Sequence, residues 1–214
     1  MKKTIMVIGL AAVLSLLPGC ASSTGEKPAD VSSGASVSGK GMASITDDIG
    51  PVADGAKTLV VYFSQGSATR RVAEDLALLF GADIEAIAEA KPRSSGFFDF
   101  MRSGYQATLK IASPILAPVS DPSAYDRLVV LTPVWSWNLS PPVRSWLRLM
   151  KGRLPPAAFV TVSGDTKPDK IVAAMAKESG TEPLAFAGFG DKDFAPENRA
   201  VYVGKISGIV EKLR

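Results

Sequence analysis

The sequence predicts an α/β fold, a doubly wound parallel sheet with helices on both faces. Short apolar runs bounded by turn residues alternate along the chain with longer segments that carry apolar residues at helical spacing. The pattern gives five strand and helix units, too few for a closed barrel, which needs about eight. The chain has 214 residues, of which 46% are hydrophobic and 21% charged, enough for one domain with a packed core.

The first residues indicate an export signal. Met1, Lys2 and Lys3 give a basic start, and the apolar run Ile5–Leu17 is shorter than an ordinary membrane span of about 20 residues. The next residues, Leu17-Pro18-Gly19-Cys20, resemble the bacterial lipoprotein signal. We therefore expect removal of residues 1–19 and lipidation of Cys20, the only cysteine, which would anchor the protein to a membrane of the cell envelope, outside the cytoplasm. The alternative is a signal peptide followed by an incidental cysteine.

Residues 20–56 are predicted to be a tether, because Ser, Gly and Ala dominate and no aromatic residue occurs between positions 21 and 57. Such a composition buries too little apolar surface to offset the entropy of ordering. The folded domain is accordingly expected to span residues 57–214.

The elements of that domain follow from hydrophobic periodicity. The predicted strands are Leu59–Phe63, Asp83–Ile87, Leu128–Leu131, Ala158–Val162 and Leu184–Phe189. Helices are predicted from Val72 to Gly81, at about Gly96–Ile111, from Pro141, at Asp169–Ser179 and at the C-terminus. In the second of these, Phe98, Met101, Tyr105 and Leu109 share one face. The charged residues Arg144, Arg148 and Lys151 are expected to lie on a solvated surface.

The composition excludes several function classes. With no histidine, the chain cannot use Ser-His-Asp or Cys-His catalysis or a His-ligated zinc site. A single cysteine excludes an internal disulfide framework and a multi-cysteine metal cluster. The net charge of +3 is nearly neutral once Lys2 and Lys3 are removed, which argues against nucleic acid as a partner.

Ligands of such sheets bind beyond the carboxyl ends of the strands, where three loops carry candidate residues. The first loop offers hydroxyls and backbone N–H groups at the start of a helix, which suits a phosphate group. It has neither the lysine of a nucleoside-triphosphate loop nor the G-x-G-x-x-G of dinucleotide sites. An ordinary strand-to-helix turn with a Ser or Thr cap is the alternative. Its residues are Ser64, Gln65, Gly66, Ser67, Ala68 and Thr69.

The second loop, Thr132–Ser140, contains two tryptophans just past a strand end. Large flat side chains at this place suit a planar aromatic ligand, although both indoles could instead cover the end of the core or an interface. The candidate residues here are Pro133, Val134, Trp135, Ser136 and Trp137, and those of the third loop are Ser163, Gly164 and Asp165.

Three segments in this order resemble the flavodoxin family. Residues 58–73, TLVVYFSQGSATRRVA, are similar to its first strand, phosphate loop and helix start. Residues 125–147, YDRLVVLTPVWSWNLSPPVRSWL, resemble its third-strand block, and residues 159–165, FVTVSGD, its fourth strand and following turn. The resemblance implies a flavodoxin-like three-layer sheet of five strands in the order 2-1-3-4-5, with FMN as the cofactor.

The resemblance also implies roles for single residues. Ser64 and Thr69 would bond the FMN phosphate, and Trp135 would lie beside the isoalloxazine ring. Backbone groups of Pro133–Trp137 and Ser163–Asp165 would line the ring. The centre of the phosphate loop departs from the family, with Gly66 in place of Thr, Ser67 in place of Gly and Ala68 in place of Asn; a positive φ at Ser67 would be strained.

The sequence thus predicts an FMN-binding electron-transfer protein, lipid-anchored to a bacterial membrane, that exchanges electrons with a membrane quinone or a redox protein. It needs no catalytic side chain, because the cofactor carries the electrons, and no metal site is expected. Arg70 or Arg71 near the phosphate would raise the reduction potential, and Asp165 near the ring would lower it. Two alternatives stay open: an NAD(P)H:quinone oxidoreductase of the same fold, and a cofactor-free binding module that contacts a partner through Trp135 and Trp137.

Overall fold

The computed structural model describes residues 43–93 and 96–214. The predicted leader, residues 1–19, and the predicted lipidation site, Cys20, lie outside the described residues. Residues Lys40–Arg214 form one compact unit.

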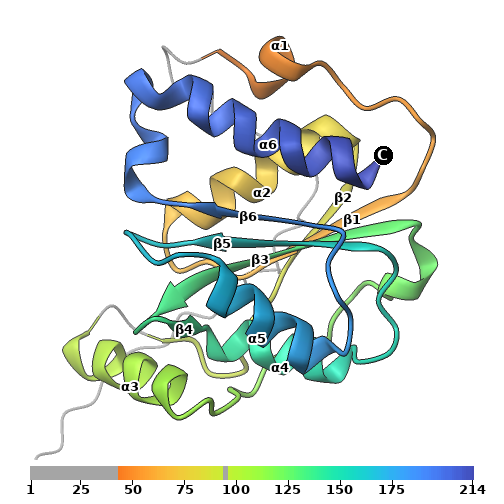
Figure 1. The fold of residues 1–214 in the computed structure, drawn as a ribbon. Helices are drawn as coiled ribbons and strands as arrows, with labels where there is room; N and C mark the ends of the chain where they lie inside the picture. Colours follow the sequence, from red (N-terminus) through yellow and green to blue (C-terminus); the bar gives the residue numbers. More distant parts are fainter. Residues whose placement is uncertain (1–42, 94–95) are drawn as a thin grey trace, which may run out of the picture. The chain divides into compact units, whose positions relative to one another are not determined.

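A parallel sheet forms the centre of this unit (Figure 1). The strands lie in the order β2-β1-β3-β5-β6 and all four neighbouring pairs are parallel. Without the short strand β4, which pairs antiparallel with β3, this is the predicted order 2-1-3-4-5, and the prediction of the fold class is confirmed. The bounds are β1 Thr58–Tyr62, β2 Asp83–Ala86, β3 Arg127–Trp135, β4 Asn138–Leu139, β5 Ala157–Val162 and β6 Ala185–Phe189.

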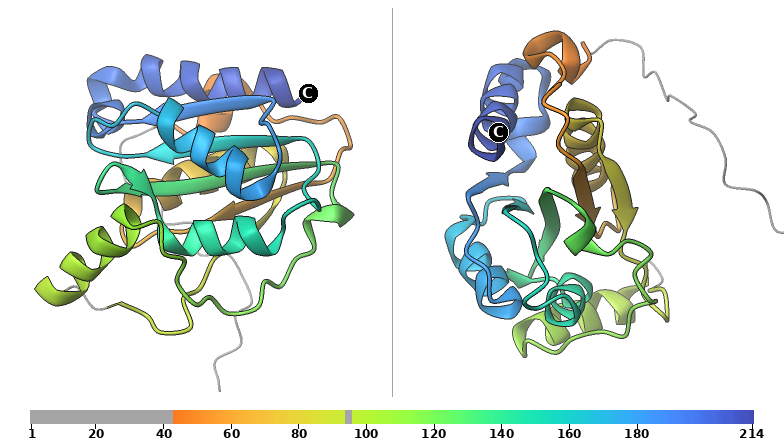
Figure 2. Two further views of the ribbon diagram at one scale, coloured as in Figure 1. Left: turned by 60° about the horizontal axis from the view of Figure 1, so that its bottom comes forward. Right: turned by 90° about the vertical axis from the view of Figure 1, so that its right-hand side faces the viewer.

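Helical layers cover both faces of the sheet, which is why the central strands are continuously apolar. On one face, α1 (Ile45–Ile49), α2 (Ser67–Phe80) and α6 (Arg199–Leu213) contribute to a core that includes Val60 and Val129. On the other face lie α4 (Pro141–Leu149) and α5 (Asp169–Ser179) (Figure 2). They contribute to a second core that includes Leu59 and Val130. Successive strand residues therefore point into different cores, as the pleat requires. Three short 3₁₀ helices occur at Pro122–Ala124, Asp191–Phe194 and Pro196–Asn198.

Helix α3 (Phe97–Thr108) lies beside the carboxyl end of β3, at the lower left of Figure 1. It forms within the predicted range Gly96–Ile111. Its predicted apolar face, however, is turned to solvent: Phe98 is 86% exposed, Met101 54%, Tyr105 64% and Leu109 52%. A helix that crosses over a sheet normally buries such a face, so the exposed face of α3 is a finding that the periodicity did not predict.

The folded domain includes residues ahead of the predicted boundary at residue 57. Ser44 caps α1 in a capping box with Asp47, and Ile45 is buried in the core at 2% exposure. Val52 is also buried, and its N–H donates to the carbonyl of Leu79 at 2.7 Å. Residues 43–56 therefore belong to the domain and not to the tether, because two apolar side chains and a helix cap outweigh a composition typical of linkers.

The expectation that Arg144 lies on a solvated surface is wrong. Arg144 is only 2% exposed and forms an ion pair with Glu178 of α5, which also pairs with Arg148 at 2.7 Å. The pair joins α4 to α5. Over the ranges that the structure describes, no helix combines the length and the apolar content needed to cross a bilayer.

Candidate functional site

The loop from β1 to α2 presents unpaired backbone N–H groups. Helix α2 starts at Ser67 with Gly66 as its N-cap, and no side chain caps it. The first N–H groups of a helix have no acceptor within it. Among the described residues, the N–H groups of Gln65, Gly66 and Ser67 also donate no bond to a loop carbonyl. No acidic residue lies in the first turn of α2, so the site has the electropositive character that binds anions.

The altered centre of this loop carries no strain at Ser67. Ser67 is the first residue of α2, and the non-glycine residues with positive φ in the described chain are Lys110, Ser136 and Trp137. Gly66 has an extended φ of −129°, and a Cβ there would meet nothing within 4 Å. The two predicted phosphate ligands differ from each other: the Ser64 hydroxyl donates to the carbonyl of Gly66, whereas Thr69 is buried in α2 at 4% exposure.

The predicted second loop is largely a β-hairpin. Strand β3 continues to Trp135, and Val134 and Trp135 pair with Leu139 and Asn138 of β4. The turn between them consists of Ser136 and Trp137, with φ of 46° and 57°. Positive φ at both turn residues is the geometry of a type I′ turn, which normally selects Asn and Gly. The turn was not predicted because neither of its residues gives that signal.

The turn places the two tryptophans in different surroundings. Trp135 is half-buried; Phe63 packs edge-on against it, with ring centroids 5.6 Å apart and an interplanar angle of 79°. Trp137 is 68% exposed, and its backbone carbonyl accepts a hydrogen bond from Lys170 Nζ at 3.1 Å.

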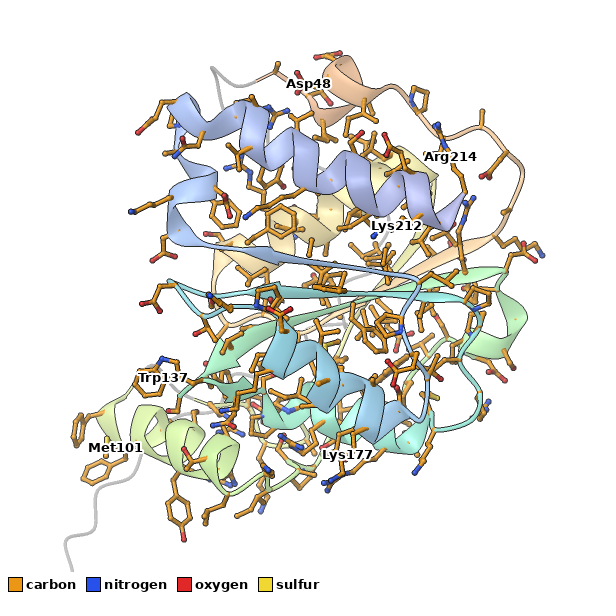
Figure 3. The ribbon with its side chains drawn as sticks, in the orientation of Figure 1. Asp48, Met101, Trp137, Lys177, Lys212 and Arg214 are labelled. Carbon is orange, nitrogen blue, oxygen red and sulfur yellow. The ribbon has the colours of Figure 1, made fainter. Side chains whose placement is uncertain are left out.

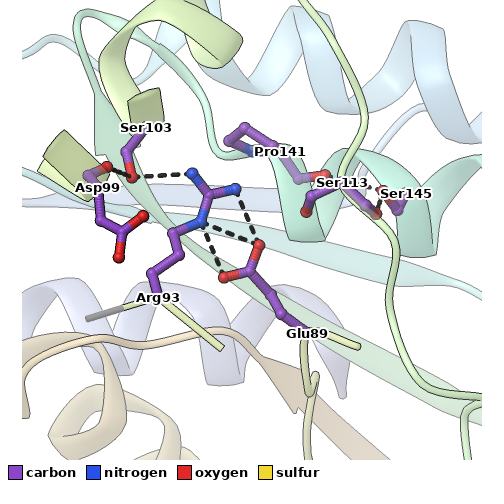
Figure 4. Close-up of polar contacts among 7 residues, drawn as sticks. All are labelled: Glu89, Arg93, Asp99, Ser103, Ser113, Pro141 and Ser145. Atoms are coloured by element: carbon purple, nitrogen blue, oxygen red, sulfur yellow. Dashed lines mark hydrogen bonds and ion pairs between the residues drawn. The ribbon is translucent and has the colours of Figure 1, made fainter. Parts of the chain in front are cut away.

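A buried ion pair between Arg93 and Glu89 (Figure 4) lies next to Trp135. The guanidinium of Arg93 lies 5.1 Å from the indole centroid and donates to both carboxylate oxygens of Glu89 at 2.8–3.0 Å. It also donates to Ser103 Oγ at 2.8 Å, and Ser103 in turn donates to the carbonyl of Asp99. The side chains of Arg93 and Glu89 are 3% and 6% exposed. This cluster was not predicted from the sequence, because its signal there is no more than a Glu and an Arg four residues apart, outside any predicted helix.

Helix α3 packs closely against the hairpin turn. A Cβ added to Gly104 would lie 2.7 Å from Ser136 Oγ, so the glycine permits the close approach. Beyond α3, the chain is tied to α4 by the hydroxyl of Ser145, which donates to the carbonyls of Ser113 and Pro141 (Figure 4). The hairpin and α3 thus form one wall beside the first loop.

Two cavities meet at Gln65. One, of about 580 Å³, lies between Gln65, the residues Val134, Trp135 and Ser136, and α3 through Met101 and Tyr105. The other, also about 580 Å³, is lined by Phe63, Ser64, Gln65, Glu89 and Arg93 among others. Cavities of about 300–1,000 Å³ are typical of small-molecule sites. The structure therefore brings together Ser64, Gln65, Val134, Trp135 and Ser136 of the predicted residues.

The third predicted loop lies outside both cavities. Ser163 Oγ accepts from the N–H of Thr166 at 3.0 Å, and the N–H of Ser163 donates to the carbonyl of Phe189. These hydrogen bonds hold the loop to itself and to β6. Neither cavity is lined by Ser163, Gly164 or Asp165, nor by Pro133, Trp137 or the residues 66–69.

The predicted cations of α2 do not lie free beside the loop. Arg70 pairs with Glu74 at 2.7 Å, and this contact raises the pKa of Arg70. Arg71 lies 5.3 Å from the ring centroid of Tyr202 and 5.7 Å from that of Phe194. In the described part of the chain, no group of three or more Asp, Glu, Cys or His residues could hold a metal ion.

The fold and the crevice at the carboxyl ends of β1 and β3 define the class of protein: a flavodoxin-like α/β domain with its ligand crevice where the strand order reverses. Residues 57–149 match the family model described as flavodoxin. The match, together with the fold, confirms the predicted resemblance of the domain to the flavodoxin family.

Similar solved structures are flavoproteins. A flavoprotein from Lactobacillus acidophilus NCFM, in complex with FMN, is 19% identical with a TM-score of 0.55 and covers 64% of this chain and 95% of its own. A flavoprotein described as putative from Bacteroides eggerthii is 20% identical with a TM-score of 0.57, covering 71% and 98%. One from Bacteroides uniformis is 19% identical with a TM-score of 0.53, covering 69% and 99%. Comparison with curated proteins gave no match.

Proposed function

We propose that the domain binds FMN and that the protein transfers electrons at a bacterial membrane, to which the lipidated Cys20 anchors it. One observation carries the proposal: the N–H groups ahead of α2 are unpaired and lie beside a cavity of about 580 Å³ that Gln65 and Trp135 line. A phosphate and a flat ring joined by a short chain suit these two neighbouring features.

The residues present fit this cofactor. The N–H groups of Gln65, Gly66 and Ser67 can bond phosphate oxygens, and no acidic side chain of the first turn opposes a dianion. Ser64 can join them once its hydroxyl leaves the carbonyl of Gly66. Val134 and Trp135 offer an apolar wall for the ring. The FMN complex of the Lactobacillus acidophilus flavoprotein supports the choice of cofactor.

FMN, when bound, supplies the redox chemistry. The residues of this chain bind and orient it. Phe63 and the Arg93–Glu89 pair hold the Trp135 ring in place, and the hairpin packs on α3 through Gly104. Because Glu89 neutralises Arg93, the buried cation beside the tryptophan adds little net charge to the site. Oriented N–H groups and a rigid aromatic wall are what an electron-transfer cofactor requires of its protein.

Membrane anchorage is proposed from the leader pattern and Cys20. The electron partner proposed is a membrane quinone or a redox protein at the same membrane. Replacing Cys20 with Ala is expected to move the protein from the membrane fraction to the soluble fraction and to abolish the mass of the acyl chains. The anchor would be contradicted if the variant stayed in the membrane fraction and the wild type carried no acyl mass.

The cofactor is tested by absorbance of the full chain in detergent, with and without added FMN. The variant Ser67→Asp puts a negative charge at the start of α2, where it stabilises the helix but repels a phosphate. We expect FMN affinity to fall about 100-fold or more. The matched control, Ala200→Asp, adds the same charge to the exposed first turn of α6 and should leave affinity unchanged. A wild type that takes up no FMN refutes the cofactor, and equal binding by Ser67→Asp refutes the phosphate site.

A further inference from the structure

We propose that the outward face of α3, together with Trp137, docks on the surface of a lipid bilayer. We call the residues Phe97, Phe98, Met101, Tyr105, Leu109 and Trp137 the α3 patch. The inference rests on the proposed membrane location, and its test needs no cofactor.

The apolar residues of the patch on α3 are each more than half exposed. Phe97 is 70% exposed and Phe98 86%, and their rings contact each other edge-on with centroids 6.0 Å apart. Phe97, Met101, Tyr105 and Leu109 follow one another at intervals of four residues, which places them on one stripe of an α-helix. Contiguous exposed apolar surface on a soluble domain marks a site of interaction with a protein or a membrane.

Helix α3 cannot bury this face by rotating. Its opposite side is already used: Ser103 and Ala107 are buried, and Gly104 packs against the hairpin turn at Ser136. Ser103 also bonds the buried Arg93. The inner side is therefore fixed by specific contacts, and the exposed side is presented permanently.

Trp137 extends the patch beyond the helix. Figure 3 shows Trp137 and Met101 at the same end of the molecule, with the side chains of α3 projecting outward. The turn holds Trp137 at 68% exposure with φ of 57°, an unusual conformation for a bulky residue. Aromatic rings with a polar tip, such as those of Trp and Tyr, are the residues that favour the boundary between lipid and water.

The charges around the patch favour a bilayer over a protein partner. Arg102 on α3, Lys110 just after it and Lys170 beside Trp137 are all exposed. Basic residues flanking a stripe of Phe, Leu, Tyr and Trp are the composition of helices that lie in the membrane interface, where they meet anionic headgroups. Asp99 is the acidic residue of α3, and it is half-buried.

The length of chain between Cys20 and the domain permits the α3 patch to face the bilayer. Between Cys20 and the first described residue, Ala43, the chain spans at most about 80 Å when extended. A domain of this size is about 40 Å across. An anchor at Cys20 would therefore allow any face of the domain to reach the bilayer. The α3 patch would determine which face contacts it. Met101 and Tyr105 also line the cavity beside Gln65, so a docked bilayer would lie next to that cavity.

The test uses the compact unit from Lys40, which lacks the leader and Cys20 and contains both cores. Its binding is measured by co-sedimentation with vesicles of phosphatidylglycerol and phosphatidylethanolamine, and by Trp emission with brominated lipids. We expect binding, a blue shift and quenching of Trp137, with weaker binding at high salt and to neutral phosphatidylcholine vesicles. The double variant Phe97→Ser/Phe98→Ser should bind at least tenfold more weakly. These two residues line neither cavity.

The matched control is Leu78→Ser/Val201→Ser, which removes exposed apolar residues from α2 and α6 and should leave vesicle binding unchanged. Equal weakening by both double variants, or no vesicle binding by the wild type, overturns the proposal. The wild type could instead bind no vesicles and form a dimer in sedimentation velocity. If Phe97→Ser/Phe98→Ser dissociated that dimer, the patch would be assigned to a second copy of the chain. The vesicle test needs no FMN, so its failure and a failure to bind cofactor are separate results.

Discussion

Arg93 and Glu89 form the most deeply buried ion pair near the proposed cofactor site. Two charges removed from water are stable only when each satisfies the other, and removing one partner leaves an unpaired buried charge. The guanidinium of Arg93 donates to both carboxylate oxygens of Glu89, and its central carbon lies over the Trp135 ring, 5.1 Å from the centroid. The pair thus fixes the position of the tryptophan as well as its own geometry.

Replacing Arg93 with Met is expected to destabilise the domain by about 3 kcal/mol, because Glu89 stays buried without its partner. Urea denaturation at neutral pH measures the change. The double variant Glu89→Gln/Arg93→Met should recover most of the loss. Arg70→Met, which breaks the exposed pair with Glu74, should leave the denaturation midpoint nearly unchanged. A double variant as unstable as Arg93→Met would show that packing of the arginine stem, and not its charge, is what matters.

The turn at Ser136 and Trp137 stores backbone strain, because both residues have positive φ. The change Trp137→Gly is expected to raise the free energy of unfolding by about 1 kcal/mol, since an exposed side chain contributes little packing. The bond from Lys170 to the carbonyl of residue 137 is retained. The same variant should weaken vesicle binding. Thermal unfolding measures the first effect, and a lowered stability would show that the indole packs more than its exposure indicates.

At the level of elements, hydrophobic periodicity predicted a strand or helix correctly where the element has the surroundings that its pattern implies. The run from Leu59 to Val61 predicted a central strand because both faces of it are covered. The predicted helix Asp169–Ser179 has the observed bounds of α5. Periodicity also predicted the position of α3, but it did not predict that the apolar face of α3 points to solvent. The spacing of apolar residues along a helix does not show whether another element covers them. Likewise, a charged residue such as Arg144 is expected at the surface. It is buried here because it pairs with Glu178, 34 positions away, and this pairing cannot be predicted from the local sequence.

The contact of α4 with α5 should make stability depend on pH in the acid range. Burial alone would raise the pKa of Glu178, but the hydrogen bond from Arg148 and the charges of Arg144 and Arg148 together lower it. A carboxyl group with a lowered pKa stabilises the fold above its ordinary pKa, near ~4.3, and loses this contribution as the pH falls through its folded value. Acid should therefore loosen the junction between the two helices.

The variant Glu178→Gln tests this dependence. At pH 7 we expect a loss of about 3 kcal/mol, because Arg144 is left buried without its partner. The difference from the wild type should shrink as the pH falls below about 4, where the wild-type carboxyl also becomes neutral. Urea denaturation across this range measures it, with the exposed Glu182→Gln as the control. A difference that stays constant with pH would mean that the charge of Glu178 is not responsible.

At the level of the whole molecule, the sequence predicted the position of the loop between β1 and α2, because strand and helix order alone place it at the switch point. It did not predict the opposite wall of the cavity, which Met101 and Tyr105 supply from a long connection with many prolines. Where the domain begins was also missed. Ser44 and Asp47 have the spacing of a capping box, but the Ser-, Gly- and Ala-rich composition around them favoured a tether.

The role of residues 43–56 can be measured directly. Ile45 is 2% exposed and Val52 8%, and Asp54 pairs with Arg127, which is itself buried beneath α6 and bonds the carbonyl of Leu213. A chain that starts at Lys57 should therefore be less stable than one that starts at Ala43, and Ile45→Ala alone should cost about 3 kcal/mol. Ala53→Ser, at an exposed position, should change stability by less than about 0.5 kcal/mol. Equal urea midpoints for the two chains would mean that residues 43–56 rest on the domain without stabilising it. A lower midpoint for the shorter chain would show that these residues contribute to the stability of the fold.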